Sequence, residues 1–204
     1  MTSPVRFFFD PSCPWTWITS RWVAEVAGAR SLDVRWEPYS LKLKNAGVEV
    51  SPEHRARYDR GFELLRVVVA VREAEGHAAV GDLYRALGTR FHNDGDEQVA
   101  PLADVLADAG LDPAFADAAK DPRHDDAIRR STDEGRRLTG EDVGLPIIVP
   151  DGRDRAFSGP VLSPAPTGEE ALALWDAYVA LTAVDGLFEV KRTRVDKPQL
   201  PARP

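Results

Sequence analysis

The first part of the chain has the hydrophobic pattern of a β-α-β unit. Residues 5–9 are rich in aromatic and β-branched side chains, which is typical of a buried strand, and turn-forming residues end it at positions 10–12. A helix is predicted over residues 14–27, where apolar side chains recur at helical spacing. Residues 32–37 alternate apolar and polar positions, which indicates a half-buried second strand.

Between residues 51 and 140 the pattern contains helices only. Ser51 and Pro52 are an N-cap residue and a first-turn proline, and the helix that they open is expected to run to about residue 75. Further helices are predicted over residues 82–89 and 96–109, after Asp112-Pro113, and after Asp121-Pro122, with a turn at residues 91–95. This segment is predicted to be a helical insertion.

Strand signals return after residue 140. Residues 147–149 form an apolar strand with an antiparallel partner at 155–158, and a capping box at Thr167 opens a last helix. A chain of 204 residues suits one domain with a large insertion. We therefore predict an α/β domain built from residues 1–50 and 141–195, the helical insertion 51–140, and a proline-rich, disordered tail at 196–204.

The single cysteine lies where the first strand gives way to the first helix. Pro14 suits the first helical position, so Cys13 is expected at or beside the N-cap, facing unpaired N–H groups and the positive end of the helix dipole. This setting favours a thiolate and predicts a pKa about one to two units below the free value of about 8.5. The alternative is a small, buried, inert cysteine. Asp10 would oppose the shift if its carboxylate pointed at the sulfur.

Composition and charge exclude several function classes. A formal net charge of −7 disfavours a nucleic-acid partner or an anionic membrane surface, and no segment is apolar enough to span a membrane. One cysteine and four scattered histidines form no metal motif, and no nucleotide-binding glycine motif is present. With no signal-peptide pattern, the cytoplasm is the expected location, and there a lone reactive cysteine needs a low-molecular-weight thiol for turnover.

The segment Asp-Pro-Ser-Cys-Pro-Trp-Thr-Trp-Ile-Thr-Ser-Arg-Trp at residues 10–22 resembles the active-site segment of DsbA-like proteins with a thioredoxin-like fold. Within that superfamily it is most similar to the mycothiol-dependent nitroreductases. Further segments that resemble this family lie at residues 90–93, 140–146, 159–163, 174–176 and 189–194. The resemblance implies a DsbA-like fold with a helical insertion, and a small-molecule substrate.

The resemblance also implies a set of site residues. Beside Cys13 they are Pro14, Trp15, Asn45, His92 and the pair Leu145-Pro146. The resemblance implies that the Leu145-Pro146 bond is cis and that Pro146 faces Cys13, and it places His92 in the pocket. From the residues alone, Trp15 is open between a pocket wall and a core residue, and His92 reads as a surface or capping residue. The basic cluster at residues 191–194 is expected to be solvated, with anion binding as the alternative.

Thr16 stands where the family pattern has its second cysteine, so Cys13 has no internal disulfide partner. The first hypothesis is therefore a monothiol oxidoreductase that uses mycothiol or a similar thiol as cosubstrate, with the Thr16 hydroxyl stabilising the thiolate. Its substrate would be a mixed disulfide or an electrophile such as a nitroaromatic. The alternatives are a thiol transferase or isomerase like the kappa-class glutathione transferases and hydroxychromene carboxylate isomerases, and a non-catalytic binding protein. The oligomeric state is open between monomer and homodimer.

Overall fold

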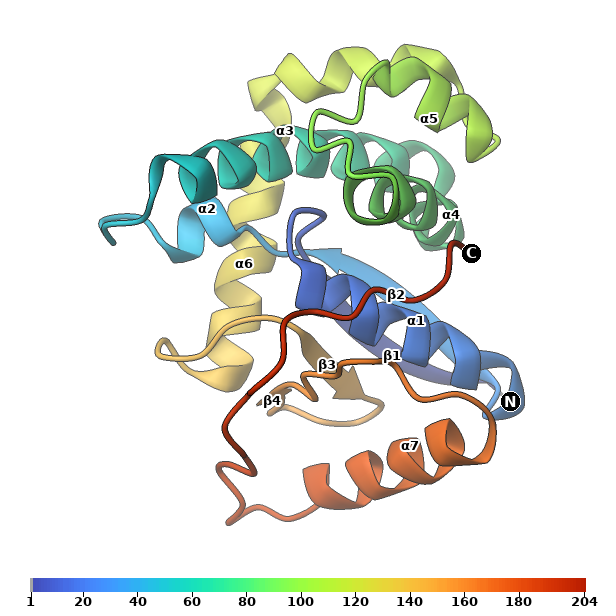
Figure 1. Cartoon of the computed structure of the whole chain (residues 1–204), viewed down its shortest axis with the longest axis vertical. Coiled ribbons are helices and arrows are strands. Elements are labelled where there is room, and N and C mark those ends of the chain that lie inside the picture. Colours follow the sequence, from blue (N-terminus) through green and yellow to red (C-terminus); the bar gives the residue numbers. More distant parts are fainter. Residues whose placement is uncertain (1) are drawn as a thin grey trace.

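The computed structural model describes residues 2–204 and contains one four-stranded sheet with the order β2-β1-β3-β4 (Figure 1). The strands are β1 (Ser3–Phe9), β2 (Leu32–Pro38), β3 (Ile147–Pro150) and β4 (Phe157–Ser158). β1 pairs with β2 in parallel and with β3 antiparallel, and β4 extends the sheet antiparallel to β3. Helix α1 (Pro14–Ala29) connects β1 to β2, so the predicted β-α-β unit is confirmed.

Both faces of β1 are buried, as its apolar composition predicts. Val5, Phe7 and Phe9 point into the larger core, which includes residues of α1 and of α7 (Gly168–Thr182). Phe8 points to the other face and packs in a second cluster with Tyr39. This alternation follows from the two-residue repeat of a strand. The carboxyl end of β1, where the chain turns toward α1, is therefore fixed by packing on both sides.

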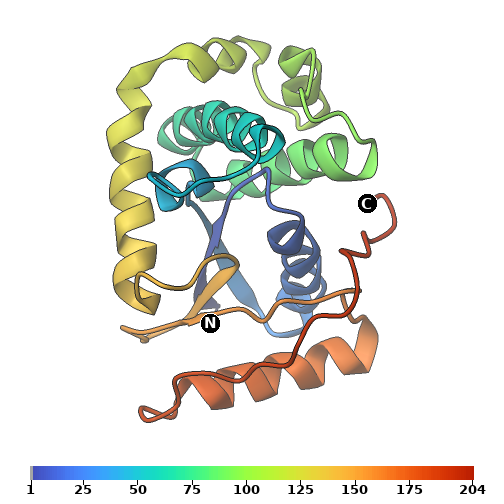
Figure 2. The ribbon, with the colours of Figure 1, turned by 60° about the vertical axis from the view of Figure 1, so that its left-hand side comes forward.

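The segment between β2 and β3 consists of helices joined by loops and contains no strand. It begins with a short helix and continues through four longer helices and three irregular helical turns: α2 (Leu41–Lys44), α3 (Pro52–Glu75), α4 (His77–Gly88), η1 (Thr89–Asn93), α5 (Leu102–Asp108), η2 (Pro113–Lys120), η3 (Pro122–His124) and α6 (Asp125–Thr139). Ser51 caps α3, and Asp112 and Asp121 cap the two 3₁₀ segments η2 and η3. Figure 2 shows α3, α4 and α5 above the sheet, α6 running down one side of it, and α7 at the opposite end.

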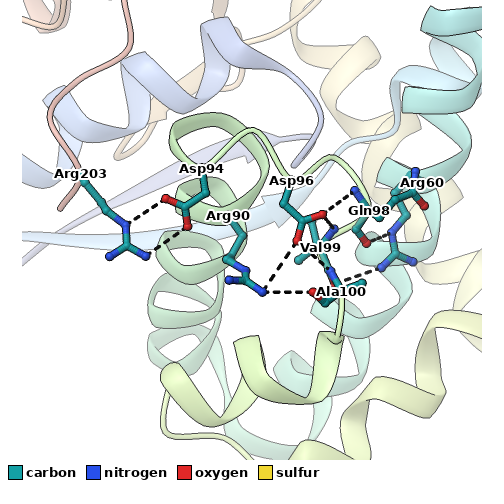
Figure 3. Close-up of polar contacts among 8 residues, drawn as sticks. All are labelled: Arg60, Arg90, Asp94, Asp96, Gln98, Val99, Ala100 and Arg203. Carbon is teal, nitrogen blue, oxygen red and sulfur yellow. Dashed lines mark hydrogen bonds and ion pairs between the residues drawn. The ribbon is translucent and has the colours of Figure 1, made fainter.

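Three local predictions from the sequence are wrong. The helix expected over residues 96–109 begins only at Leu102, because the Asp96 carboxylate accepts hydrogen bonds from the N–H groups of Gln98, Val99 and Ala100 and holds a turn instead (Figure 3). The first part of the turn expected at 91–95 is π-helical instead, because η1 spans Thr89–Asn93. Thr167 precedes α7 but makes no side-chain capping bond.

The C-terminal segment follows α7 without further secondary structure and runs alongside α1 toward α4 (Figures 1 and 2). Residues 196–204, for which the sequence predicts disorder, have defined contacts in the structure. Asn93 donates to the Pro201 carbonyl at 2.8 Å, and Arg203 makes two hydrogen bonds of 3.1 Å to Asp94. No helix within residues 2–204 has the length and apolar character needed to cross a membrane.

Candidate active site

Cys13 is the N-cap residue of α1, as the sequence predicts. Its backbone is extended, with φ −89° and ψ 111°, Pro14 occupies the first turn, and the Cys13 carbonyl accepts the N–H of Trp17 at 3.0 Å. The thiol is free and only 6% exposed. The strand-turn-helix geometry is confirmed, but the sulfur is far less accessible than a residue at an exposed helix end.

The turn from β1 to α1 is shaped by the buried Asp10. One carboxylate oxygen accepts hydrogen bonds from the Ser12 N–H (2.9 Å) and the Ser12 hydroxyl (2.7 Å), and the other accepts the Leu41 N–H (2.8 Å). Burial raises the pKa of Asp10 to about 6 although these bonds and the Arg57 cation favour the charged form. Asp10 thus fixes the turn that presents Cys13 and ties it to α2.

The helical insertion holds the same turn from outside. Arg57 of α3 donates to the Ser12 carbonyl at 3.2 Å, and its other nitrogen pairs with Glu97. Gly61 lies one helical turn further along α3, where a Cβ atom would come within 2.5 Å of Asp10 Oδ1. Only glycine permits this approach of the helix to the turn. One face of α3 therefore covers the turn that carries Cys13.

His92 makes the third contact between the insertion and this turn. Its Nε2 lies 2.8 Å from the Pro11 carbonyl oxygen, which only accepts, so Nε2 carries the proton. Burial lowers the pKa of His92 to about 4, and its ring stacks on Trp17. The prediction that His92 ties the insertion to the active site agrees with this geometry, in which a neutral imidazole binds the backbone two residues before Cys13.

The predicted depression of the Cys13 pKa is wrong. Burial raises the pKa of the thiol, and the Asp10 carboxylate adds to this, whereas the Thr16 hydroxyl and the N–H groups of Thr16 and Trp15 lower it. The favourable N-terminus of α1 is present, but the sulfur has lost its hydration through burial, and α3 contacts the adjoining turn. Loss of hydration disfavours a charged sulfur more than the first-turn N–H groups favour it. Cys13 therefore rests as a protonated thiol.

Thr16 is fully buried on the first turn of α1. Its hydroxyl favours the Cys13 thiolate, yet Thr16 Oγ1 has no hydrogen-bond partner of good geometry among residues 2–204. Most buried hydroxyl groups are hydrogen-bonded, so this one is an exception that needs an explanation. The Thr16 hydroxyl thus interacts with the Cys13 sulfur without a hydrogen bond of good geometry, and it keeps hydrogen-bonding capacity for a further group.

The other predicted site residues have different settings. Trp15 is partly exposed, and the Arg194 guanidinium lies 4.9 Å from the centroid of its ring. Asn45 follows α2 and donates to the Leu41 carbonyl at 2.8 Å, so it reaches the Cys13 turn only through Leu41. The Leu145–Pro146 peptide bond is cis and leads into β3. A contact between Pro146 and Cys13 stays a prediction.

Two residues of α3 at this site were not predicted from the sequence. They are Arg57, described above, and Tyr58, whose pKa is raised by burial and by the nearby Cys13 and Asp10. Neither belongs to a motif, and both lie more than forty residues after Cys13 in the sequence. Their role depends on how the insertion folds back over the turn, which no local pattern reports.

Titration of Asp10 is expected to couple folding stability to pH. The folded-state pKa of about 6 is above the ordinary value of 3.8, so the folded protein binds this proton more tightly than the unfolded chain. The stability that Asp10 contributes is therefore complete below about pH 4 and lost as the pH rises through about 6. Relative to Asp10→Asn, which cannot titrate, the free energy of unfolding of the wild type should fall by about 3 kcal/mol across this range. Urea unfolding of both proteins at several pH values measures it; a pH-independent difference would contradict the assignment.

Removal of the Arg57 bond is expected to expose Cys13. In Arg57→Gln the Ser12 carbonyl loses a charged hydrogen-bond donor, so the turn should open more often and expose Cys13. The rate of alkylation of Cys13 by iodoacetamide at fixed pH should rise about fivefold, which corresponds to the loss of about 1 kcal/mol from one hydrogen bond. Arg60→Gln is the matched control, because Arg60 lies on the same helix and donates to the Gln98 carbonyl, away from the Cys13 turn (Figure 3). Equal alkylation rates for the two variants would show that Arg57 does not hold the turn.

Comparison with known proteins identifies the family of this chain. Residues 12–192 match the family model described as Rv2466c-like, mycothiol-dependent nitroreductase Rv2466c. A relative from Mycobacterium tuberculosis, the uncharacterized protein Rv2286c, is 28% identical over 193 aligned residues, and the match covers 93% of this chain and 82% of that protein.

Solved structures support the fold. The cytosolic disulfide reductase DsbM from Pseudomonas aeruginosa with GSH matches with a TM-score of 0.58 and 17% identity, over 87% of this chain and 100% of that one. A 2-hydroxychromene-2-carboxylate isomerase matches with a TM-score of 0.57 and 14% identity, over 87% of this chain and 94% of the other. The predicted DsbA-like thioredoxin fold is thus confirmed, and the family match identifies a thiol oxidoreductase. The chain belongs to the Rv2466c-like family of mycothiol-dependent nitroreductases.

Proposed function

We propose that this enzyme is a monothiol oxidoreductase in which Cys13 is the nucleophile and a low-molecular-weight thiol, mycothiol or a similar one, completes the cycle. The observation that carries this proposal is the place of Cys13 at the N-terminus of α1, beside the uncommitted Thr16 hydroxyl. The family description, which names mycothiol, supports the choice of thiol. A cytoplasmic location, where such thiols stay reduced, belongs to the same proposal.

With a mixed disulfide as substrate, the Cys13 thiolate attacks one sulfur atom. A bond forms between Cys13 Sγ and that sulfur, the original S–S bond breaks, and the second sulfur leaves as a thiolate that takes up a proton. Cys13 has no second cysteine to attack it, so a small thiol must cleave the new disulfide and restore the Cys13 thiol. After this cycle one half of the substrate has left as a thiol and the other half as a disulfide with the small thiol. A second small thiol that cleaves this disulfide completes the two-electron reduction, which yields two substrate thiols and one disulfide of the small thiol.

A nitroaromatic substrate requires the same electrons. Reduction of a nitro group to a nitroso group and water consumes two electrons and two protons, which the Cys13 thiol and one small thiol supply when they join as a disulfide. A second small thiol then releases Cys13. The chain's own residues hold the reacting sulfur at the start of α1 and offer it the first-turn N–H groups and the Thr16 hydroxyl.

The buried hydroxyl of Thr16 fits the binding of a second sulfur. It lies on the first turn of α1 with Cys13, and beyond its influence on the Cys13 sulfur it makes no hydrogen bond of good geometry within residues 2–204. Such a group can donate to a thiolate and accept from a thiol. A small thiol bound there lies beside Cys13, as attack on a Cys13 disulfide requires.

The raised pKa of Cys13 has two consequences for this proposal. Few molecules hold a thiolate at neutral pH, but a thiolate of high pKa is intrinsically more nucleophilic. Cys13 is 6% exposed and Thr16 is fully buried, and α3 contacts the turn before them through Arg57, so we propose that a substrate enters when the insertion moves away from this turn. That movement restores hydration to the sulfur and thereby lowers the pKa of Cys13.

One observation favours a second candidate. Because burial raises the pKa of Cys13, a bound thiol activated by Thr16 could perform the attack in place of Cys13. This is the transferase or isomerase reaction expected for proteins similar to kappa-class glutathione transferases. The structural similarity to a 2-hydroxychromene-2-carboxylate isomerase shows a shared fold and leaves this candidate to experiment.

The two candidates differ in the fate of Cys13→Ser. We expect wild-type protein incubated with mycothiol disulfide to gain one mycothiol on Cys13 by intact mass, and Cys13→Ser to gain none and to lose mycothiol-dependent reduction of a model nitroaromatic. Retention of thiol-dependent activity by Cys13→Ser would instead support the transferase reaction. Thr16→Cys is the companion variant, because residue 16 lies on the first turn of α1 and a cysteine there can form a disulfide with Cys13. Intact mass should show this disulfide as the loss of two hydrogen atoms. The mycothiol adduct on Cys13 should then be transient, because the new cysteine displaces mycothiol.

A further inference from the structure

The exposed edge of the active site carries a cation that comes from the C-terminal segment. The Arg194 guanidinium carbon lies 4.9 Å from the centroid of the Trp15 ring, and Trp15 is two residues from Cys13. Arg194 is exposed and forms no ion pair with a carboxylate of residues 2–204. Its neighbours in the segment are engaged differently: Lys191 pairs with Glu189, and Arg203 pairs with Asp94.

The path of the C-terminal segment accounts for the place of Arg194. Beyond this residue, the Ser163 hydroxyl donates to the Lys197 carbonyl and accepts the Gln199 N–H. Asn93 then donates to the Pro201 carbonyl while its own oxygen accepts the indole N–H of Trp17. These contacts and the Arg203–Asp94 pair, shown in Figure 3, lead the segment past the start of α1.

The charge of this segment contrasts with the rest of the molecule. Residues 188–204 contain five basic and two acidic side chains, whereas the whole chain has a formal net charge of −7. An anionic ligand is therefore repelled by most of the surface and attracted to this segment. A guanidinium that rests one face on an aromatic ring keeps the N–H donors along its edge free for two parallel bonds to a carboxylate.

We propose that Arg194 and Trp15 form a subsite that selects substrates carrying a carboxylate next to the group that Cys13 attacks. The carboxylate binds the free edge of Arg194, and the apolar part of the substrate lies against Trp15, which brings its reactive atom toward Cys13. Arg194 is then a specificity-determining residue supplied by the C-terminal segment. This inference rests on the proposed role of Cys13 as nucleophile.

Two aromatic disulfides of different charge test the subsite. The Cys13 thiolate attacks either reagent, a disulfide forms between Cys13 and one aromatic thiol, and the other aromatic thiolate leaves and is measured by its absorbance. With the dianionic disulfide of thionitrobenzoate, Arg194→Gln should lower the second-order rate constant roughly three- to tenfold at low ionic strength, as expected for loss of one exposed cationic partner. With neutral dipyridyl disulfide the rate constant should stay within about twofold, because the variant removes no group that acts on the sulfur.

Arg192→Gln is the matched control. It removes the same charge from the same segment, and Arg192 lies over no aromatic ring of residues 2–204. The proposal predicts that only Arg194→Gln loses the preference for the anionic reagent. Equal losses in both variants, or an equal slowing of Arg194→Gln with both reagents, would overturn it.

A binding measurement separates this inference from the proposed function. Nitrobenzoate and its neutral counterpart nitrobenzamide are titrated into each protein, and the indole N–H resonance of Trp15, assigned by its loss in Trp15→Phe, is followed by NMR. Nitrobenzoate should shift this resonance in the wild type and in Arg192→Gln at concentrations where Arg194→Gln shows no shift. If Cys13 fails to react with either disulfide, the nucleophile proposal fails, while this titration still decides the subsite. A shift of equal size in Arg194→Gln overturns the subsite.

Discussion

The turn that carries Cys13 is held by the helical insertion, and the properties of the site depend on this contact. Arg57 binds the Ser12 carbonyl, His92 binds the Pro11 carbonyl, and Gly61 lets α3 approach Asp10 without a side chain between them. The turn itself is shaped by Asp10, which accepts three hydrogen bonds in the interior. One side chain from α3 and one from η1 thus bind the two backbone carbonyls that precede Cys13, and Cys13 itself is buried.

Two opposing effects act on the Cys13 sulfur, and their magnitudes decide its state. A helix N-terminus stabilises a charge by roughly 0.3–1 kcal/mol, which is less than one pKa unit. Full burial can shift a pKa by up to about 3–5 units in the opposite direction. The thiol is 6% exposed, so burial dominates and its pKa is raised. In the proposed function, the N-terminus of α1 stabilises the Cys13 thiolate effectively only when the insertion moves away from the turn. The same movement exposes the sulfur to the substrate and lowers its pKa.

Much of the framework around Cys13 could be predicted from the sequence, because its signals are local. The apolar run at 5–9, the turn residues and Pro14 specify a strand, a turn and a helix in order, and the structure places Cys13 where they meet. The pKa direction could not be predicted, since the burial of the sulfur depends on tertiary packing, which includes the approach of α3, beginning at Pro52, to the Cys13 turn. Arg57 and Tyr58 were missed for the same reason. The helix expected at 96–109 failed through a single side chain, Asp96, whose carboxylate competes with the helix for three N–H groups.

The most direct test is the titration of Cys13 in the reduced wild-type protein, followed by the ultraviolet absorbance of the thiolate, with Cys13→Ser as the blank. The insertion's cover over the turn predicts a midpoint above the value of about 8.5 for a free cysteine. A midpoint below that value would contradict the account, because it would mean that the helix N-terminus, and not the cover provided by α3, determines the state of the sulfur.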